Sequence, residues 1–245
     1  MGRPGRPPKP KLPSVDTTSP QLTKAEVMKH WGNGLYEVHP ELWIPHAIGE
    51  TLDPWQERVV RQLFLGEKHK VSVRAGHGSG KTWLSSRLAS QFLMTHTPSL
   101  IIVTGPTGKQ TRNQFWSYLT TGIQRSVFRA DIECLATRVF IKGDSAEEWK
   151  VVWVTSKEPK TIEGFHHENL LWIVEEAKAV ADPVFESLSG ALSQEGNFLY
   201  ISSTCGPPRG HFFDSHTRLR HLYDTAHVPS TASSRVSPAK IQLWK

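Results

Sequence analysis

The chain is predicted to fold as an α/β domain in which helices flank a central, mostly parallel sheet. After Gly66, β-rich runs alternate with helical ones. A glycine-rich loop joins the first β-rich run to a helical one, and a later apolar run ends in two carboxylates. Alternation of this kind is typical of parallel strands that are connected by helical crossovers.

The order of the elements follows from the apolar patterning. Strands are inferred from runs rich in β-branched and aromatic residues, and helices from apolar residues at helical spacing. The strands are expected at residues 70–74, 100–104, 138–141, 151–155, 170–174 and 198–202, and the helices at residues 82–94, 110–125 and 183–192.

Composition divides the chain into four segments. Residues 1–20 are dense in Pro, Gly, Lys and Arg, which predicts a disordered basic tail. Residues 21–50 carry apolar residues at mixed helical spacing, which predicts short helices packed against the main domain. The main domain is expected over residues 51–225. Residues 226–245 return to Ser, Thr and Pro and are expected to form a linker.

The net charge of +6 is concentrated in the tail, where Arg3, Arg6, Lys9 and Lys11 precede the first acidic residue, Asp16. The stretch GRPGRPPKP resembles an AT-hook, a short arm that enters the minor groove of DNA. A solvated leader without a partner explains it equally well. The remainder is close to neutral, so charge alone does not identify a nucleic-acid-binding protein.

The two cysteines, Cys134 and Cys205, are too few for a disulfide framework and lack the spacing of a metal site. Both are expected to be buried as small apolar residues. No uninterrupted apolar run is long enough to span a bilayer, and the N-terminus has no apolar segment typical of a signal peptide. A soluble protein without membrane partners is therefore expected.

The glycine-rich loop AGHGSGKT, residues 75–82, fits the Walker A pattern, with Ala75 in the opening position that Gly usually occupies. Its glycines let successive N–H groups surround a phosphate, and the following helix adds its positive N-terminal end. Lys81 is expected to reach the β- and γ-phosphates and Thr82 to bind Mg²⁺, so the cofactors predicted are ATP and Mg²⁺. The residues expected to hold the nucleotide are Ala75, Gly76, His77, Gly78, Ser79, Gly80, Lys81 and Thr82.

The apolar run LLWIVEEA, residues 170–177, ends in Glu175 and Glu176. A strand that runs beneath the loop delivers its last residues to the metal, so Glu175 is expected to act on Mg²⁺ through water. Glu176 is then placed to orient and deprotonate the attacking water. This is a Walker B arrangement with Glu where Asp is usual, and the two roles could also be reversed.

Two weaker patterns complete the site. The run FLYISST, residues 198–204, ends in Ser203 and Thr204, which are expected to sense the γ-phosphate and couple hydrolysis to later segments. Ser and Thr are also ordinary turn formers. In DPWQ, residues 53–56, Gln56 is expected to bind the adenine edge beside Trp55, and a surface Gln at a helix start is the alternative.

The order of these motifs resembles the ATPase domain of bacteriophage large terminases. The resemblance implies a P-loop NTPase of the RecA/ASCE-like type over residues 51–225. It also implies that Arg74 matches a Walker A arginine that acts on the γ-phosphate. The alternative is a strand-end arginine without a catalytic role, with the arginine finger supplied by a neighbouring subunit. The matching stretches are PWQ, RAGHGSGKT, VTGPT ending at Thr107, Gly164 to His166 before EEA, and SST followed by GHFFD.

The resemblance implies an ATP-driven motor that translocates double-stranded DNA into a procapsid. The implied partners are the portal protein, the small terminase subunit and further copies of the chain in a ring. The implied location is the host cytoplasm and, transiently, the procapsid portal.

Large terminases also contain a nuclease of the RNase H type, in which clustered Asp residues hold two metal ions. After Thr204 the only carboxylate side chains are Asp214 and Asp224, so nuclease activity is not expected from this chain. Two alternatives to a working motor remain. One is a truncated or split chain that binds nucleotide without independent turnover, and the other is a RecA-like helicase.

Overall fold

The computed structural model describes residues 20–106, 109–143, 147–155, 165–192, 194 and 196–243. The basic tail through residue 19, Thr107 and Gly164 lie outside the described residues, so the predictions made for them are not addressed by the structure.

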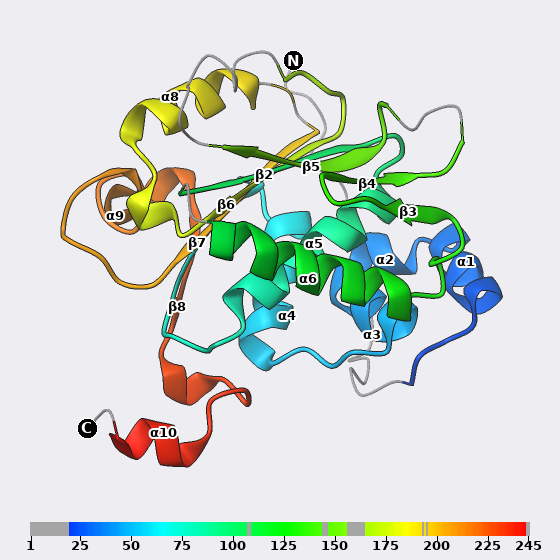
Figure 1. Ribbon diagram of the computed structural model, residues 1–245, viewed down its shortest axis with the longest axis horizontal. Helices are drawn as coiled ribbons and strands as arrows, with labels where there is room; N and C mark the ends of the chain where they lie inside the picture. The colour runs from blue at the N-terminus through cyan, green and yellow to red at the C-terminus, as the bar shows by residue number, and fades with distance from the viewer. Residues whose placement is uncertain are drawn as a thin grey trace, which may run out of the picture.

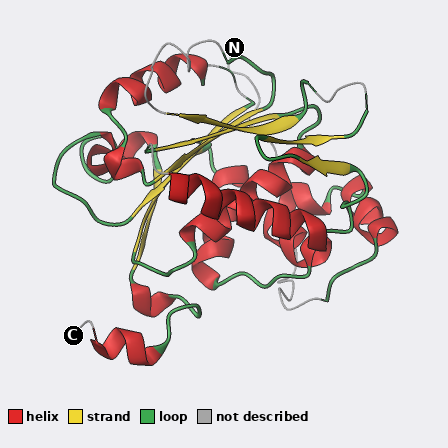
Figure 2. Ribbon diagram, in the orientation of Figure 1, coloured by secondary structure: helices red, strands yellow, loops and turns green. Residues whose placement is uncertain are grey.

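A mixed sheet forms the centre of the fold (Figure 2). Its strand order is β3-β4-β5-β2-β6-β7-β1-β8. Strands β5, β2, β6, β7, β1 and β8 are parallel, whereas β3 and β4 are antiparallel to their neighbours. The bounds are β1 Lys70–Ala75, β2 Leu100–Gly105, β3 Ile132–Cys134, β4 Arg138–Ile141, β5 Lys150–Thr155, β6 Leu170–Glu175, β7 Asn197–Ser203 and β8 Asp224–Val228.

Helices cover both faces of the sheet (Figure 1). One face carries the N-terminal helices with α4, α5 and α6, and the other carries α8 and α9. The main helices are α4 Pro54–Leu65, α5 Lys81–Thr95, α6 Lys109–Arg125, α8 Asp182–Ala191 and α9 His211–Ser215. The predicted fold class, an α/β domain with a central, mostly parallel sheet flanked by helices, is confirmed.

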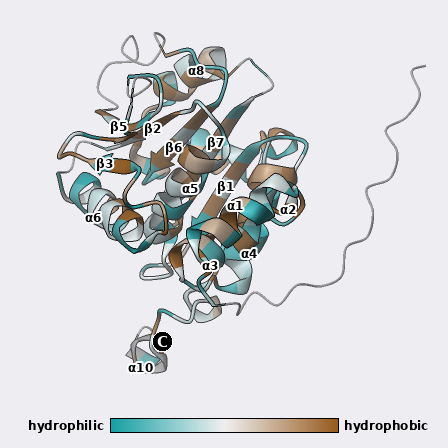
Figure 3. Ribbon diagram, turned by 90° about the vertical axis from the view of Figure 1, so that its right-hand side faces the viewer, coloured by the Kyte–Doolittle hydropathy of each residue, from teal (hydrophilic) through white to brown (hydrophobic). Residues whose placement is uncertain are grey.

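The two-sided core explains why the central strands are almost wholly apolar. Along β6, Leu171 and Ile173 pack toward the face with α5, and Leu170, Trp172 and Val174 pack toward the face with α8. A strand buried on both faces gains from apolar residues at every position. The strands accordingly carry the hydrophobic colour between more polar helices in Figure 3.

Short helices occupy the N-terminal segment, as the sequence predicts: α1 Lys24–Gly32, α2 Leu35–Val38, η1 Pro40–Leu42 and α3 Trp43–Ile48. Thr23 caps α1 through a capping box with Glu26. Trp43 is fully buried and stacks on Phe128, with ring centroids 6.3 Å apart, which fastens the segment to the chain that follows α6.

All the strands and helices expected from the sequence are present, with ends shifted by no more than one residue. Strands β3 and β8 were not expected. β3 is three residues long, and β8 is an edge strand in which only Val228 is buried. Strand β3 is too short, and β8 too polar, to show the alternation from which a strand is predicted.

The composition of the C-terminal segment suggested a linker from Ala226 onward, and this is wrong for its first part. Residues 226–228 belong to β8, which pairs in parallel with β1. The 3₁₀ helices η2 Ala177–Ala179 and η3 Arg220–Leu222 lie earlier in the chain. Another 3₁₀ helix, η4 Ser230–Ala232, and the helix α10 Pro238–Leu243 follow β8. In Figures 1 and 3, α10 stands away from the body of the domain.

The expectation of two buried cysteines is also wrong, because Cys134 is half-buried and Cys205 is exposed in the turn after β7. Across the described ranges, no helix is both long enough and apolar enough to cross a membrane.

Candidate functional site

The three motifs lie side by side because their strands are neighbours. The sheet order places β7 between β6 and β1. Glu175 at the end of β6 is in register with Ser202 of β7, and Ser203 is in register with Arg74 of β1. Parallel strands end at a common edge, so the glycine-rich loop, the paired acids and the hydroxyl residues meet there, where α/β proteins bind their ligands.

The loop after β1 has the backbone of a phosphate cradle. Gly78 and Gly80 have φ angles of 72° and 91°, in the left-handed region that favours glycine. Helix α5 begins directly after Gly80, and among the described residues no side chain caps its N-terminus. The N–H groups of its first turn therefore remain free for an anionic ligand, which the helix dipole also favours.

Lys81 and Glu176 face each other across this loop. Lys81 Nζ lies 3.2 Å from Glu176 Oε1, and Ser203 Oγ donates to the other carboxylate oxygen, Oε2, at 3.2 Å. Glu176 has a φ of 47°, a left-handed conformation that is uncommon for a residue with a side chain. Such strain is typically retained at functional sites, and here the turn brings the carboxylate of Glu176 to Lys81.

Thr82 and Glu175 form a second contact beneath the loop, where the Thr82 hydroxyl donates to Glu175 Oε2 at 2.8 Å. Glu175 is fully buried, and burial raises the pKa of its carboxyl above the ordinary value. Its other oxygen, Oε1, has no hydrogen-bond partner among the described residues. A buried carboxylate oxygen without a partner, beside a threonine hydroxyl, fits the oxygen chemistry of Mg²⁺.

Glu175→Gln is expected to raise the melting temperature of the chain by a few degrees at pH 8. For a chain of this size, a gain of 1 kcal/mol in the free energy of unfolding raises the melting temperature by about 2–4 °C. The amide keeps the shape of the side chain but cannot ionise, so the cost of a buried ionisable group is avoided. Because the folded-state pKa of Glu175 lies above the unfolded value of 4.5, ionisation costs the folded state stability as the pH rises past that value. The difference in melting temperature should therefore grow above about pH 4.5. Thermal unfolding measured from pH 4 to pH 8 checks this, and an unchanged or lower value at pH 8 would contradict it.

A cavity of about 480 Å³ opens over the loop. Of the residues predicted from the sequence, it brings together His77, Gly78, Gly80, Lys81, Thr82 and Glu176. Four further lining residues were not predicted: Trp83, Gln114, Tyr118 and Arg235. Trp83 directly follows the Walker A motif and could have been noticed, whereas Arg235 lies in the stretch expected to be a linker.

Gln56 is fully buried, and the two ends of its side-chain amide differ in their hydrogen bonding. Its Oε1 accepts from the Asp53 N–H at 2.8 Å within the capping box of α4. Its Nε2 has no partner in the described part of the chain and points near Gly80, since a Cβ added to Gly80 would lie 3.2 Å from it. Gln56 thus retains a free donor beside the loop. Trp55 packs in the core and does not line the cavity, where Trp83 takes that position.

Arg74 lies apart from the cavity over the loop. It lines a smaller pocket with Lys178 and the turn after β7, residues 205–209. Its Nε is buried and has no partner within the described ranges. Thr204 also turns to this side, where its hydroxyl accepts a hydrogen bond from Lys178 Nζ. Of the two hydroxyl residues expected to couple hydrolysis, only Ser203 contacts the paired acids.

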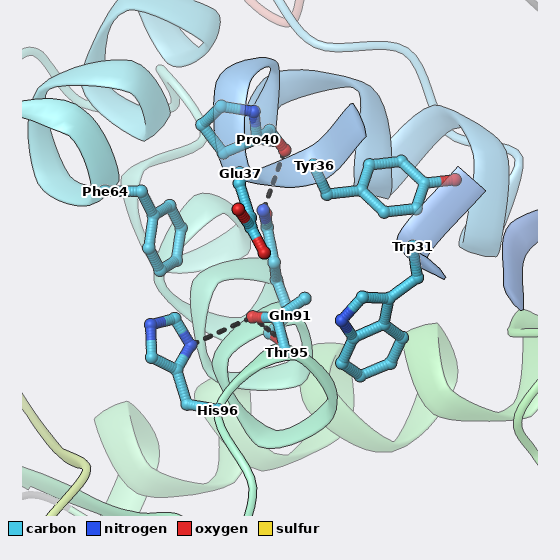
Figure 4. Close-up of a pocket in the computed structure, with 8 residues that line it drawn as sticks. All are labelled: Trp31, Tyr36, Glu37, Pro40, Phe64, Gln91, Thr95 and His96. Carbon is cyan, nitrogen blue, oxygen red and sulfur yellow. Dashed lines mark hydrogen bonds between the residues drawn. The ribbon is translucent and has the colours of Figure 1, made fainter. Parts of the chain in front are cut away.

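A separate cavity of about 230 Å³ lies between the N-terminal helices and the far end of α5 (Figure 4). Trp31, Tyr36, Phe64 and His96 line it, and burial lowers the pKa of His96 to about 4, so this ring is neutral at pH 7. Lys81 begins α5 and Thr95 ends it, a rise of roughly 21 Å at 1.5 Å per residue. None of the chemistry predicted from the sequence lies in this cavity.

No family model matches the chain. It is 27% identical over 187 residues to a probable terminase large subunit of Enterobacteria phage P7, an alignment that covers 72% of this chain and 37% of that protein. The chain therefore spans little more than a third of the length of this relative.

Solved structures share the fold at low sequence identity. The large terminase of a thermophilic bacteriophage has a TM-score of 0.62 at 11% identity, covering 80% of this chain and 50% of that one. The HK97 bacteriophage large terminase has a TM-score of 0.56 at 13% identity, covering 73% and 39%. The Thermus phage P74-26 large terminase ATPase domain has a TM-score of 0.55 at 14% identity, covering 74% and 82%. The resemblance to large terminases that the motifs predict is confirmed.

Proposed function

We propose that this chain, which has the fold of terminase ATPase domains and is similar in sequence to a phage large terminase subunit, is the ATP-hydrolysing motor of viral DNA packaging. It couples ATP hydrolysis to the translocation of double-stranded DNA into a procapsid. The observation that carries the proposal is the pair of contacts at the loop, Lys81 with Glu176 and Thr82 with Glu175. Solved complexes of a thermophilic bacteriophage large terminase with ADP and with ATP-γ-S support a nucleotide as the ligand.

Each residue has a role that follows from its place. The N–H groups at the start of α5 and the Lys81 ammonium hold the β- and γ-phosphates. Thr82 and Glu175 would hold Mg²⁺, which neutralises phosphate charge when it is bound. Glu176 accepts the proton of the attacking water at its carboxylate, and Ser203 keeps that carboxylate oriented.

The arginine that stabilises the transition state has two possible sources. Arg74 could turn from its pocket beside Lys178 toward the γ-phosphate, or a neighbouring subunit could supply an arginine. A ring of several copies on the portal protein, with the small terminase subunit presenting DNA, would satisfy the second case. We place this assembly in the host cytoplasm, at the procapsid portal.

DNA cutting is not part of the proposed activity. The two carboxylates after Thr204 are engaged elsewhere, because Asp214 pairs with Arg218 at 2.6 Å and Asp224 lies 3.5 Å from Lys68 Nζ. Two-metal cleavage needs several carboxylates that converge on ions about 4 Å apart.

Phosphate release by the purified chain, alone and with duplex DNA and procapsids, tests the function. Mg²⁺-dependent release that increases with both additions, without strand separation or nicking, is the expected result. A chain that binds ATP but never releases phosphate would be a nucleotide-binding subunit. Unwinding of a duplex with a single-stranded tail would favour a helicase.

A further inference from the structure

The chain that follows β8 crosses directly over the phosphate-binding loop. We call residues 229–236 the strap. Immediately before it, the Val228 carbonyl accepts from the Gly76 N–H at 2.9 Å. Within it, the Ser233 hydroxyl bonds to the Ser79 carbonyl at 3.0 Å and lies 3.1 Å from Asp53 Oδ2. The strap is therefore tied to the Walker A loop and to the start of α4.

The strap also packs against each glycine of the loop. A Cβ added to Gly76 would lie 2.1 Å from Ser230 Oγ, and one added to Gly80 would lie 2.7 Å from Arg235 Cδ. At Gly78 the neighbour is Val236, at an ordinary contact distance of 3.6 Å. Glycine is thus needed at positions 76 and 80 for the approach of the strap as well as for the curvature of the loop.

The Arg235 side chain extends from the strap into the cavity over the loop. Its guanidinium carbon lies 3.9 Å from the centroid of the Trp83 ring, and both side chains line the cavity with Lys81. The Trp83 ring is in turn positioned by Arg87, whose guanidinium carbon lies 5.0 Å from the ring centroid and which pairs with Glu50. Within the described ranges Arg235 forms no salt bridge, so it offers a cation to the cavity without an acidic partner.

The position of Arg235 points to one end of the nucleotide. Lys81 and Glu176 mark the phosphate end of the cavity. Arg235 Nε and Gln56 Nε2 converge at Gly80, where they lie 2.9 and 3.2 Å from an added Cβ. A planar guanidinium and a free amide donor are groups that stack on a purine and donate to its ring nitrogens.

We propose that Arg235, which lies over the Trp83 ring, is a nucleotide-binding residue that contacts the base and ribose of ATP together with Gln56. This inference rests on the proposed ATPase function and adds the strap to its site. Arg235 contributes to binding of the nucleoside part rather than to catalysis. Because both donors can serve adenine and guanine nitrogens, the contact favours nucleotides over bare phosphates more than it separates one purine from another.

The test compares ATP with inorganic tripolyphosphate, a ligand that has no base or ribose. Calorimetric titration of each ligand into the full chain, in the presence of Mg²⁺, gives the dissociation constant of that ligand. For Arg235→Ala the constant for ATP is expected to rise about 5- to 30-fold, which is the range for loss of a desolvated cation–π or stacking contact. The constant for tripolyphosphate should stay within about twofold. For Arg235→Lys the dissociation constant for ATP should lie between those of the wild type and Arg235→Ala, because an ammonium retains the charge but lacks the planar guanidinium.

Arg58→Ala is the matched control, since Arg58 is an exposed arginine on α4 that does not line the cavity over the loop. It should leave both constants unchanged. Equal weakening of ATP and tripolyphosphate by Arg235→Ala would overturn the inference and place Arg235 at the phosphates. Unchanged binding of both ligands would also overturn it.

The outcomes separate the inference from the function. If Arg235→Ala weakens the binding of ATP but not of tripolyphosphate, and the wild-type chain releases no phosphate, the proposed function fails and the role of Arg235 stands. If the wild-type chain hydrolyses ATP and Arg235→Ala has the wild-type KM, the function stands and the inference fails.

Discussion

Lys81→Ala is expected to lower ATP turnover by at least about 100-fold and to weaken nucleotide binding. The ammonium lies at the start of α5, beside the cavity over the loop. In the proposed function it neutralises phosphate charge in the ground state and the transition state. Its partner Glu176 is 27% exposed in its side chain, so the carboxylate left behind remains hydrated and the fold should persist. Steady-state phosphate release and ATP titration on the same preparation measure the two effects.

Lys29→Ala is the matched control, because Lys29 is an exposed lysine in the last turn of α1, remote from the loop. This variant should have wild-type turnover. Near wild-type turnover by Lys81→Ala, with unfolding curves that match the wild type, would show that the loop does not hold the phosphates of the hydrolysed nucleotide.

Glu176→Gln is expected to reduce the rate of hydrolysis by about 100- to 10,000-fold while ATP binding is retained. The amide preserves the shape and the contact with Ser203 but cannot accept a proton from water. It also releases Lys81 from its 3.2 Å ion pair, which favours binding of phosphate by the ammonium. Single-turnover hydrolysis separates the chemical step from binding.

Glu186→Gln, at an exposed position on α8, provides the control and should behave as the wild type. If Glu175→Gln kept binding and lost hydrolysis while Glu176→Gln remained active, the roles of the two acids would be the reverse of those proposed.

The sequence was sufficient to predict the central strands of the sheet, the helices between them and the position of the glycine-rich loop, because those features depend on local patterns. The buried strands are apolar at almost every position, and each ends where a glycine or a polar group begins. Glu175 ends such a strand and Glu176 follows it, and the structure places them beside Thr82 and Lys81 as their order predicts.

The features that were not predicted depend on contacts between distant segments. Arg235 reaches the loop only because β8 pairs with β1 and leads the chain back over it. The Ser, Thr and Pro composition of this stretch resembles that of a linker, since its contacts use hydroxyl groups and one cation rather than apolar side chains. Arg74 was expected at the γ-phosphate, but successive side chains of a strand point to opposite faces, and Arg74 shares the face of the Ser72 contact with Ser215 in α9.

The most direct test of the account is a crystal structure of the chain with ATP-γ-S and Mg²⁺. The predicted result is a triphosphate within residues 76–82, with Lys81 Nζ on phosphate oxygens instead of Glu176. The metal should lie at Thr82 and within one water of Glu175, and the base should lie beside Arg235. A nucleotide bound elsewhere, with the Lys81–Glu176 pair intact and the loop empty, would contradict the assignment of this cavity as the ATPase site.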